Sequence, residues 1–256
     1  MKDHSLLLEI KNLSLRFGGV VATDDLSFTL QKGKVTAMIG PNGAGKTTVL
    51  NIISGFLHPD AGEIWYQGIN IARLSPIKIL KMGIARTFQE LRLFHRLRVI
   101  DNVLLGIQNR EEENPIIALM RGRLPTENSQ HMDRAFELLE FCDLADKAGE
   151  LVANLSYGEQ KLTALARTLA TGANLIFLDE PSSGFLPAFI EERLCPLIRR
   201  LVDNGTNILL VDHNMEVVMN VSDTIIVLVV GKKIAEGAPS EIRKNSEVIK
   251  VYLGGA

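Results

Sequence analysis

The sequence has little cysteine, no long hydrophobic run and no excess of positive charge. Its 256 residues include two cysteines, Cys142 and Cys195, in neither a CxxC nor a paired cysteine–histidine spacing. This spacing argues against a disulfide framework and a structural zinc site, so we expect two free, buried thiols. Basic residues number 28 and acidic residues 30, which gives a formal net charge of −2. Binding of nucleic acid through bulk positive charge is therefore disfavoured.

No stretch is long enough to cross a membrane. The most apolar stretches, residues 207–211 and 224–230, fall far short of the ~20 residues that a spanning helix requires. The first residues, MKDHSLLLEIK, lack the apolar run of a secretory signal. We therefore expect the chain to be cytoplasmic unless a partner holds it elsewhere.

The pattern of apolar residues changes along the chain. Short β-type runs are predicted at residues 6–10, 13–17, 26–30 and 35–39. A Lys-Gly turn predicts a hairpin between the last two runs. A helix follows at 46–54, and PDAGEIWYQG predicts a turn, a short strand and a second turn. Further on, helices are predicted at 99–107, 132–141, 158–172, 188–203 and 215–221, and strands at 175–178 and 207–211.

The later alternation of helices and strands is typical of βαβ units and a mostly parallel sheet. We predict a single α/β domain over residues 1–256. Residues 1–89 and 156–240 would form its core together with an antiparallel β subdomain. Residues 90–155 would form an inserted helical lobe, and residues 241–256 a C-terminal helical tail.

The segment GPNGAGKT, from Gly40 to Thr47, matches the phosphate-loop pattern GxxxxGK[ST]. It follows the apolar run at 35–39 and opens the helix that begins near Lys46. Glycines let the backbone wrap phosphate oxygens, and the helix N-terminus adds partial positive charge. Lys46 should reach the β- and γ-phosphates, and the Thr47 hydroxyl should ligate Mg²⁺. The motif alone does not distinguish kinases, GTPases and ATPases.

Two carboxylates follow the apolar strand in LIFLDEP. Asp179 is suited to hold Mg²⁺ through water. Glu180 is suited to accept a proton from the attacking water as a general base.

The segment LSYGEQ, residues 155–160, precedes an excellent helix pattern with Ser156 near its N-cap. It resembles the LSGGQ signature of ABC ATPases, with Tyr157 in place of the usual glycine. Gln89 in ARTFQE and His213 in LLVDHNM match the Q-loop glutamine and the switch histidine of that family. Residues 6–237 therefore resemble an ABC nucleotide-binding subunit. The resemblance implies a P-loop NTPase core with a mixed, mainly parallel sheet, an antiparallel β subdomain and an inserted helical subdomain.

The resemblance also implies roles for individual residues. Two subunits would meet head to tail, with each ATP between the phosphate loop of one and the signature of the other. The first chain would contribute Phe17, Gly40, Pro41, Asn42, Gly43, Ala44, Gly45, Lys46, Thr47 and Thr48, and the partner chain Ser156, Gly158 and Glu159. Gln89 would touch Mg²⁺ and the attacking water and link them to the helical lobe, and His213 would contact the γ-phosphate. Phe17 would stack on adenine, and a buried core phenylalanine is the alternative.

Two segments depart from the family pattern. After Glu180 the family usually places an Asp or Asn that helps the two sites communicate, but the run here is SSGFLP. Leu186 has no polar group, so we expect altered coupling or an altered hydrolysis rate with the phosphate chemistry intact. In addition, Val229 and Val230 stand before Gly231, where a polar strand end is expected.

Three segments are similar to one branch of the family, the longer of the two ATP-binding subunits of branched-chain amino acid importers. They are ARTFQELRLFHRLRVIDNVLLG, the insert between residues 109 and 130, and the ending VYLGGA. This similarity implies ATP and Mg²⁺ as cofactors and a location at the cytoplasmic face of the plasma membrane. The implied partners are membrane permease subunits, a second ATPase subunit, more often a different one than a copy, and indirectly an extracytoplasmic binding protein. Residues 88–94 are the candidate groove for the permease.

Two alternatives stay open, a lipopolysaccharide-export type of ABC ATPase and a nucleotide-switched protein without transport. ABC ATPases of DNA repair or chromosome packing carry a long coiled coil, and this sequence has no sustained heptad run. ABC proteins of translation normally carry two ATPase copies, and this sequence shows one.

Overall fold

The computed structural model describes residues 5–107 and 129–253. The insert predicted between residues 109 and 130 therefore lies almost wholly outside the described residues. The chain divides into two compact units, residues 1–86 with 174–256, and residues 87–173. The second unit extends beyond the lobe predicted at 90–155, because helix α6 (Tyr157–Ala170) packs against helices α3 (Val99–Leu104) and α5 (Ser129–Phe141).

The first unit is built on a six-stranded sheet with the order β10-β9-β3-β8-β7-β6. All its neighbouring pairs are parallel except β9 and β10. The residues of β3, β7 and β8 are buried throughout, as expected for parallel strands covered on both faces. The bounds are β3 Val35–Ile39, β6 Ile84–Arg86, β7 Leu175–Asp179, β8 Asn207–Val211, β9 Thr224–Val229 and β10 Lys232–Gly237.

A four-stranded antiparallel sheet completes the strands of this unit, in the order β2-β1-β4-β5. The two runs predicted at 6–10 and 13–17 form one strand of 12 residues, with a register shift between Ile10 and Leu13. The bounds are β1 Leu6–Phe17, β2 Val20–Gln31, β4 Ala61–Tyr66 and β5 Ile69–Asn70.

The hairpin predicted between the runs at 26–30 and 35–39 is wrong. Strands β2 and β3 belong to different sheets, and β3 pairs with β8 and β9 instead. The turn between them is anchored elsewhere, because the Gly33 amide donates to Asn207 Oδ1 at 2.6 Å. The uninterrupted apolar run of β3 fits a site between two parallel neighbours better than a half-exposed hairpin.

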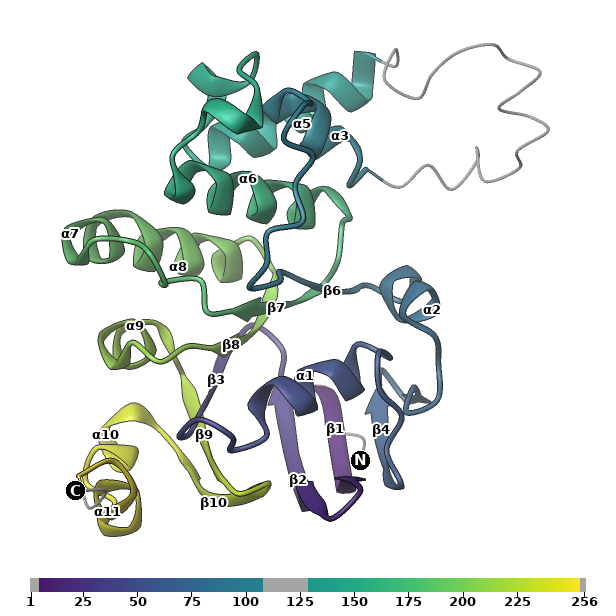
Figure 1. Ribbon diagram of the computed structural model, residues 1–256, viewed down its shortest axis with the longest axis vertical. Helices are drawn as coiled ribbons and strands as arrows, with labels where there is room; N and C mark the ends of the chain where they lie inside the picture. The colour runs from purple at the N-terminus through teal and green to yellow at the C-terminus, as the bar shows by residue number, and fades with distance from the viewer. Residues whose placement is uncertain (1–4, 108–128, 254–256) are drawn as a thin grey trace. The chain divides into compact units, whose positions relative to one another are not determined.

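Helix α1 (Lys46–Ile53) lies in the core of this unit, close to β1 and β2 (Figure 1). Its buried residues Val49, Leu50, Ile52 and Ile53 belong to one cluster with residues of both sheets. That cluster includes Leu8 and Ile64 of the antiparallel sheet and Met38, Phe177 and Leu209 of the six-stranded sheet. The helix that follows the phosphate loop is therefore held by apolar packing on both sides.

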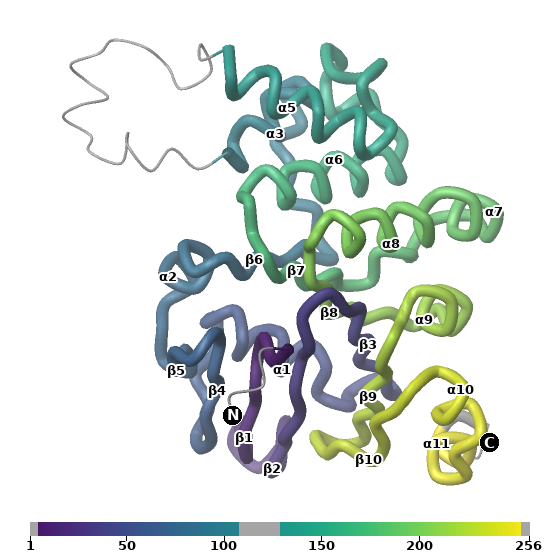
Figure 2. The backbone as a smooth tube through the Cα atoms, turned by 180° about the vertical axis from the view of Figure 1, so that it is seen from behind, coloured from purple at the N-terminus to yellow at the C-terminus, as the bar shows by residue number. Residues whose placement is uncertain are grey.

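Helices on the later half of the chain complete the unit. The helix predicted at 188–203 consists of α7 (Pro187–Phe189), a π-helical turn (Ile190–Leu194) and α8 (Cys195–Asp203). Helix α8 packs against β8 and against α9 (Met215–Val221). Helices α10 (Pro239–Ile242) and α11 (Ser246–Leu253) lie beside β10 (Figure 2).

The remaining elements are short. Helix α2 (Pro76–Lys81) and strands β5, β6 and β10 were not predicted. The second unit also has two 3-10 turns, Ala145–Lys147 and Val152–Asn154. Cys142 and Cys195 are free and buried, as predicted. Over residues 5–107 and 129–253, no helix has the length and apolar character needed to cross a membrane.

Candidate nucleotide site

The phosphate loop is shaped by two glycines that pack against neighbouring backbone. A Cβ on Gly40 would overlap the carbonyl oxygen of Leu228, and one on Gly45 would overlap that of Ala22. Gly45 is also the N-cap of α1 and has a φ of +100°, which L side chains rarely adopt. Glycine at these positions lets the chain turn sharply between β3 and α1. The first backbone amides of the helix therefore lie at the loop.

Lys46 lies with its ammonium inside this loop. Its Nζ donates to the carbonyl oxygens of Gly40 at 2.7 Å and Pro41 at 3.0 Å, and the residue is 7% exposed. Burial lowers the pKa of Lys46, and the nearby carboxylates of Glu180 and Asp179 oppose that shift. The loop thus holds a shielded positive charge beside two acids.

The turn between β9 and β10 is hydrogen-bonded to the phosphate loop. The Gly231 amide donates to Ala44 O, and the Asp24 amide of β2 donates to Gly231 O, both at 3.0 Å. Val230, which precedes this glycine, has a φ of +46° and is 68% exposed. The apolar side chain at this position therefore lies at the surface, outside the core.

Asp179 is the last residue of β7, and its carboxylate is buried. Its Oδ2 accepts from Arg86 Nη2 at 2.6 Å, and both side chains are about one-twentieth exposed (5% and 6%). Arg86 Nη1 donates to Asn51 Oδ1 on α1, also at 2.6 Å. The carboxylate predicted to serve Mg²⁺ is therefore half of a buried ion pair.

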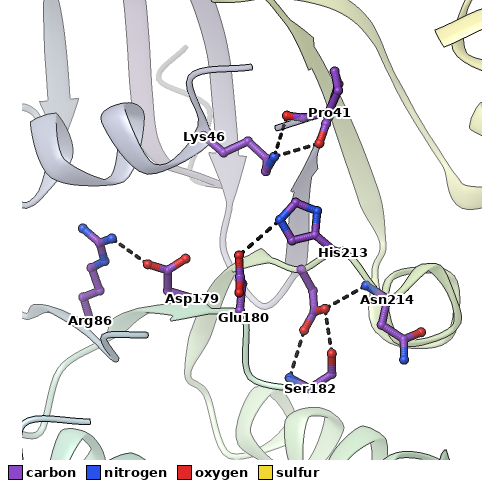
Figure 3. Close-up of polar contacts among 10 residues, drawn as sticks. Pro41, Lys46, Arg86, Asp179, Glu180, Ser182, His213 and Asn214 are labelled. Carbon is purple, nitrogen blue, oxygen red and sulfur yellow. Dashed lines mark hydrogen bonds and ion pairs between the residues drawn. The ribbon is translucent and has the colours of Figure 1, made fainter. Parts of the chain in front are cut away.

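Glu180 and His213 approach each other from the ends of β7 and β8. The distance from His213 Nε2 to Glu180 Oε1 is 3.1 Å (Figure 3). Glu180 has a φ of +49°, and its amide donates to Val211 O at 2.7 Å. This unusual backbone conformation turns the carboxylate out of the strand direction and toward the imidazole. The pair is partly open to solvent, with the His213 side chain 46% exposed and the Glu180 side chain 23% exposed.

Asp212 holds the two segments that follow these residues. The carboxylate accepts from the Ser182 amide at 3.0 Å, the Ser182 hydroxyl at 2.7 Å and the Asn214 amide at 2.8 Å. Asp212 is 3% exposed. It thus ties the chain just after Glu180 to the chain just after His213.

Phe17 ends β1 and is 50% exposed, so the alternative of a core phenylalanine is wrong. An exposed aromatic ring remains available for stacking on a base. Leu186 precedes α7 and is 76% exposed, which leaves its apolar side chain open to a partner or to solvent.

The signature residues begin helix α6 in the second unit. Ser156 is its N-cap, as predicted, and its Oγ accepts from the Glu159 amide at 3.3 Å. The Glu159 carboxylate in turn accepts from the Ser156 amide at 2.8 Å and from its hydroxyl at 2.7 Å. These hydrogen bonds lower the pKa of Glu159. Gly158 lies in the first turn of this helix, and Gln89 lies in an exposed loop of the same unit.

The first unit alone brings Lys46, Asp179, Glu180 and His213 together (Figure 3). Sequence reasoning missed Arg86, Asn51 and Asp212. Asp212 could have been noticed, since it directly follows the apolar run of β8 and precedes His213. Nothing in the sequence points to the contact between Arg86 and Asp179, which are 93 positions apart.

The donor atoms suit Mg²⁺ bound together with phosphates. Across the two described stretches, no group of three or more His, Cys, Asp or Glu residues could hold a metal by itself. Mg²⁺ usually keeps several waters and takes one or two protein oxygens plus substrate phosphates. Thr47, exposed in the first turn of α1, and the carboxylate of Asp179 supply oxygens of that kind.

Family comparisons agree with this geometry. The family profile "ABC transporter" matches residues 23–183, and "Branched-chain amino acid ATP-binding cassette transporter" matches residues 232–256. The high-affinity branched-chain amino acid transport ATP-binding protein LivG of Salmonella typhimurium is 39% identical, with 98% of each chain covered. A probable LivG of Archaeoglobus fulgidus is 35% identical over 97% of this chain and 95% of its own.

Solved structures agree as well. The ADP conformation of an ATP-binding cassette of an ABC transporter superposes with a TM-score of 0.85, 30% identity and coverage of 97% and 99% of the two chains. A dimeric ATP-binding cassette bound to ADP and Pi has a TM-score of 0.75 and 26% identity, with 91% and 99% covered. These findings confirm the predicted fold class and agree with the predicted branch. The chain belongs to the ABC transporter family and is one of its ATP-binding cassettes.

Proposed function

We propose that this chain binds ATP with Mg²⁺ and hydrolyses it to drive the import of branched-chain amino acids through a membrane transporter. The observation that carries the proposal is the convergence of a buried ammonium, two carboxylates and an imidazole beside one phosphate loop. The choice of cargo is supported by the names of the LivG relatives and by the profile that matches residues 232–256.

Nucleotide binding follows from the loop. The amides at the start of α1 and the Lys46 ammonium supply donors for the β- and γ-phosphates. Lys46 would exchange the carbonyl oxygens of Gly40 and Pro41 for phosphate oxygens. The exposed ring of Phe17 would stack on the adenine.

Hydrolysis follows from Glu180 and His213. Glu180 would accept a proton from the attacking water, and His213 would orient that carboxylate through the 3.1 Å contact while it reaches the γ-phosphate. The Thr47 hydroxyl and, through water, the Asp179 carboxylate would hold Mg²⁺, which would supply positive charge to offset the charge on the phosphates. Gln89, in the loop that begins the second unit, would contact the same metal and water.

A complete site would need a second subunit. Ser156, Gly158 and Glu159 at the N-terminus of α6 would face the nucleotide bound by the partner chain, where helix amides favour negative charge. The partner is a second ATPase subunit, different from this chain in the arrangement we favour. Permease subunits would dock near residues 88–94 at the cytoplasmic face of the plasma membrane, and a binding protein on the other side would deliver the cargo.

The test is transport by the whole complex. This chain, co-expressed with its permease and sister ATPase and reconstituted in vesicles, should take up leucine only with Mg-ATP supplied on the ATPase side. Glu180→Gln should abolish the uptake and slow phosphate release while nucleotide still binds. Uptake that is equal without ATP, or equal in the variant, would contradict the proposal.

A further inference from the structure

Arg86 lies where three elements of the first unit meet. It is the last residue of the edge strand β6, and its side chain is 5% exposed. One end of the guanidinium donates to Asp179 at the end of β7, and the other end donates to Asn51 on α1, each at 2.6 Å. The residue is thus a bridge between the helix of the phosphate loop and the strand that carries the metal-binding carboxylate.

A buried ion pair is weak evidence for added stability, so we interpret this bridge by the geometry that it fixes. Burying two charges is costly, and their attraction offsets that cost only in a well-formed pair. The planar guanidinium presents its donors in a rigid fork, so it sets both contacts at once. Its hydrogen bond to Oδ2 constrains the rotation of the Asp179 carboxylate. Figure 3 shows the other oxygen turned toward the side of Glu180.

The contact with Asn51 links the Asp179 carboxylate to the helix that carries the Thr47 hydroxyl, the second oxygen expected at the metal. Thr47 and Asn51 are four residues apart on α1, so they lie on the same face of the helix, one turn apart. The chain of contacts from Asp179 through Arg86 to Asn51 therefore ends one turn below the Thr47 hydroxyl. A shift of the guanidinium would change the separation of the two oxygens.

We propose that Arg86 is a positioning residue for the Mg²⁺ site: it aims the Asp179 carboxylate and holds it in register with Thr47. The inference rests on the proposed function, because it takes Asp179 and Thr47 as the residues that serve the metal. Lysine cannot replace arginine here, since an ammonium lacks the fork that reaches Asp179 and Asn51 together.

The test measures metal binding apart from turnover. Mn²⁺, which replaces Mg²⁺ and is visible by electron paramagnetic resonance, is titrated into the full chain with a non-hydrolysable ATP analogue. Loss of a group that orients a metal ligand typically weakens metal affinity about 10- to 100-fold. We expect Arg86→Lys to raise the Mn²⁺ midpoint within that range. Nucleotide binding in EDTA should be unchanged, and the exposed Arg73→Lys should match the wild type in both measurements.

A double substitution separates positioning from a general effect on folding. If Arg86 acts through Asp179, Arg86→Lys should add nothing to the Mn²⁺ midpoint of Asp179→Asn. Asn51→Ala, which removes only the second contact, should shift the midpoint in the same direction by a smaller factor. It carries the test if Arg86→Lys does not fold.

Three results would overturn the inference. They are an unchanged Mn²⁺ midpoint in both Arg86→Lys and Asn51→Ala, a lower Mn²⁺ midpoint in Arg86→Lys, or a further shift when Arg86→Lys is added to Asp179→Asn. A lower midpoint would mean that the guanidinium competes with the metal for Asp179. Failure of the proposed function looks different, because the wild type would then retain neither nucleotide nor Mn²⁺. That outcome would remove both proposals.

Discussion

Replacing Asp212 by asparagine should destabilise the first unit and slow hydrolysis together. The buried carboxylate accepts three hydrogen bonds, two from Ser182 and one from the Asn214 amide. Asparagine keeps one acceptor oxygen but turns an NH₂ group toward the remaining donor. Since Ser182 lies two residues after Glu180 and Asp212 directly precedes His213, the loss acts on both chemical groups at once.

The magnitude follows from the donors left without an acceptor. One buried unsatisfied donor costs ~1–3 kcal/mol, so Asp212→Asn should lower the free energy of unfolding by about 2 kcal/mol. Asp212→Ala leaves both backbone amides, of Ser182 and Asn214, without an acceptor, which by the same rule costs roughly 2–6 kcal/mol. A misplacement of catalytic groups by about 1 Å costs roughly 100-fold in rate, so phosphate release should fall by up to that factor.

The protein offers a suitable probe for this measurement. Its single tryptophan, Trp65, lies in β4 of the unit that contains Asp212, so its fluorescence during urea unfolding reports that unit. Both variants should lower the urea midpoint with an unchanged slope, alanine more than asparagine. The reasoning would be refuted if both variants kept the wild-type urea midpoint. It would also be refuted if both lost the same stability and neither released phosphate more slowly.

Further predictions concern caps, turns and the exposed leucine. Ser156→Ala should cost the second unit ~1 kcal/mol, seen by helical circular dichroism during urea unfolding. The pKa of Glu159 in the folded protein lies below its usual 4.5, so its contribution to stability is present above about pH 4.5 and is lost as the pH falls through the lowered pKa. Glu159→Gln should abolish this pH dependence of the urea midpoint. Gly45→Ala should lower the thermal midpoint more than Gly43→Ala, since both have positive φ but only the first lacks space for a Cβ; equal shifts would contradict this. Leu186→Asn should change stability by less than about 0.5 kcal/mol because the side chain is 76% exposed, while ATP turnover by the assembled transporter changes; unchanged turnover would exclude a role in coupling.

Local signals predicted much of this architecture. The glycines before α1 and the lysine that begins it form one local motif, as do the cap at Ser156 and the two carboxylates at the end of β7, so the structure of each depends on near neighbours in sequence. The helix and strand alternation after residue 157 likewise follows from periodicity over short windows.

Contacts between distant segments were beyond that reach. The Lys-Gly turn at residues 32–33 resembles a hairpin turn. However, β3 pairs with β8 and β9, which lie more than 170 positions further along the chain. The edge strand β6 has three residues and no distinct pattern of its own. Its terminal Arg86 has meaning only next to Asp179, which the sheet order and not the sequence brings beside it.

The central claim is that the phosphate loop holds the terminal phosphates of a nucleotide through Lys46. The most direct measurement is equilibrium binding of fluorescent ATP to the purified chain in the presence of Mg²⁺. Loss of a hydrogen bond to a charged group costs ~1.5–3 kcal/mol, so Lys46→Ala should weaken binding about 10- to 150-fold. Glu180→Gln should bind as the wild type does. Wild-type affinity in Lys46→Ala, or no binding by the wild type, would contradict the account.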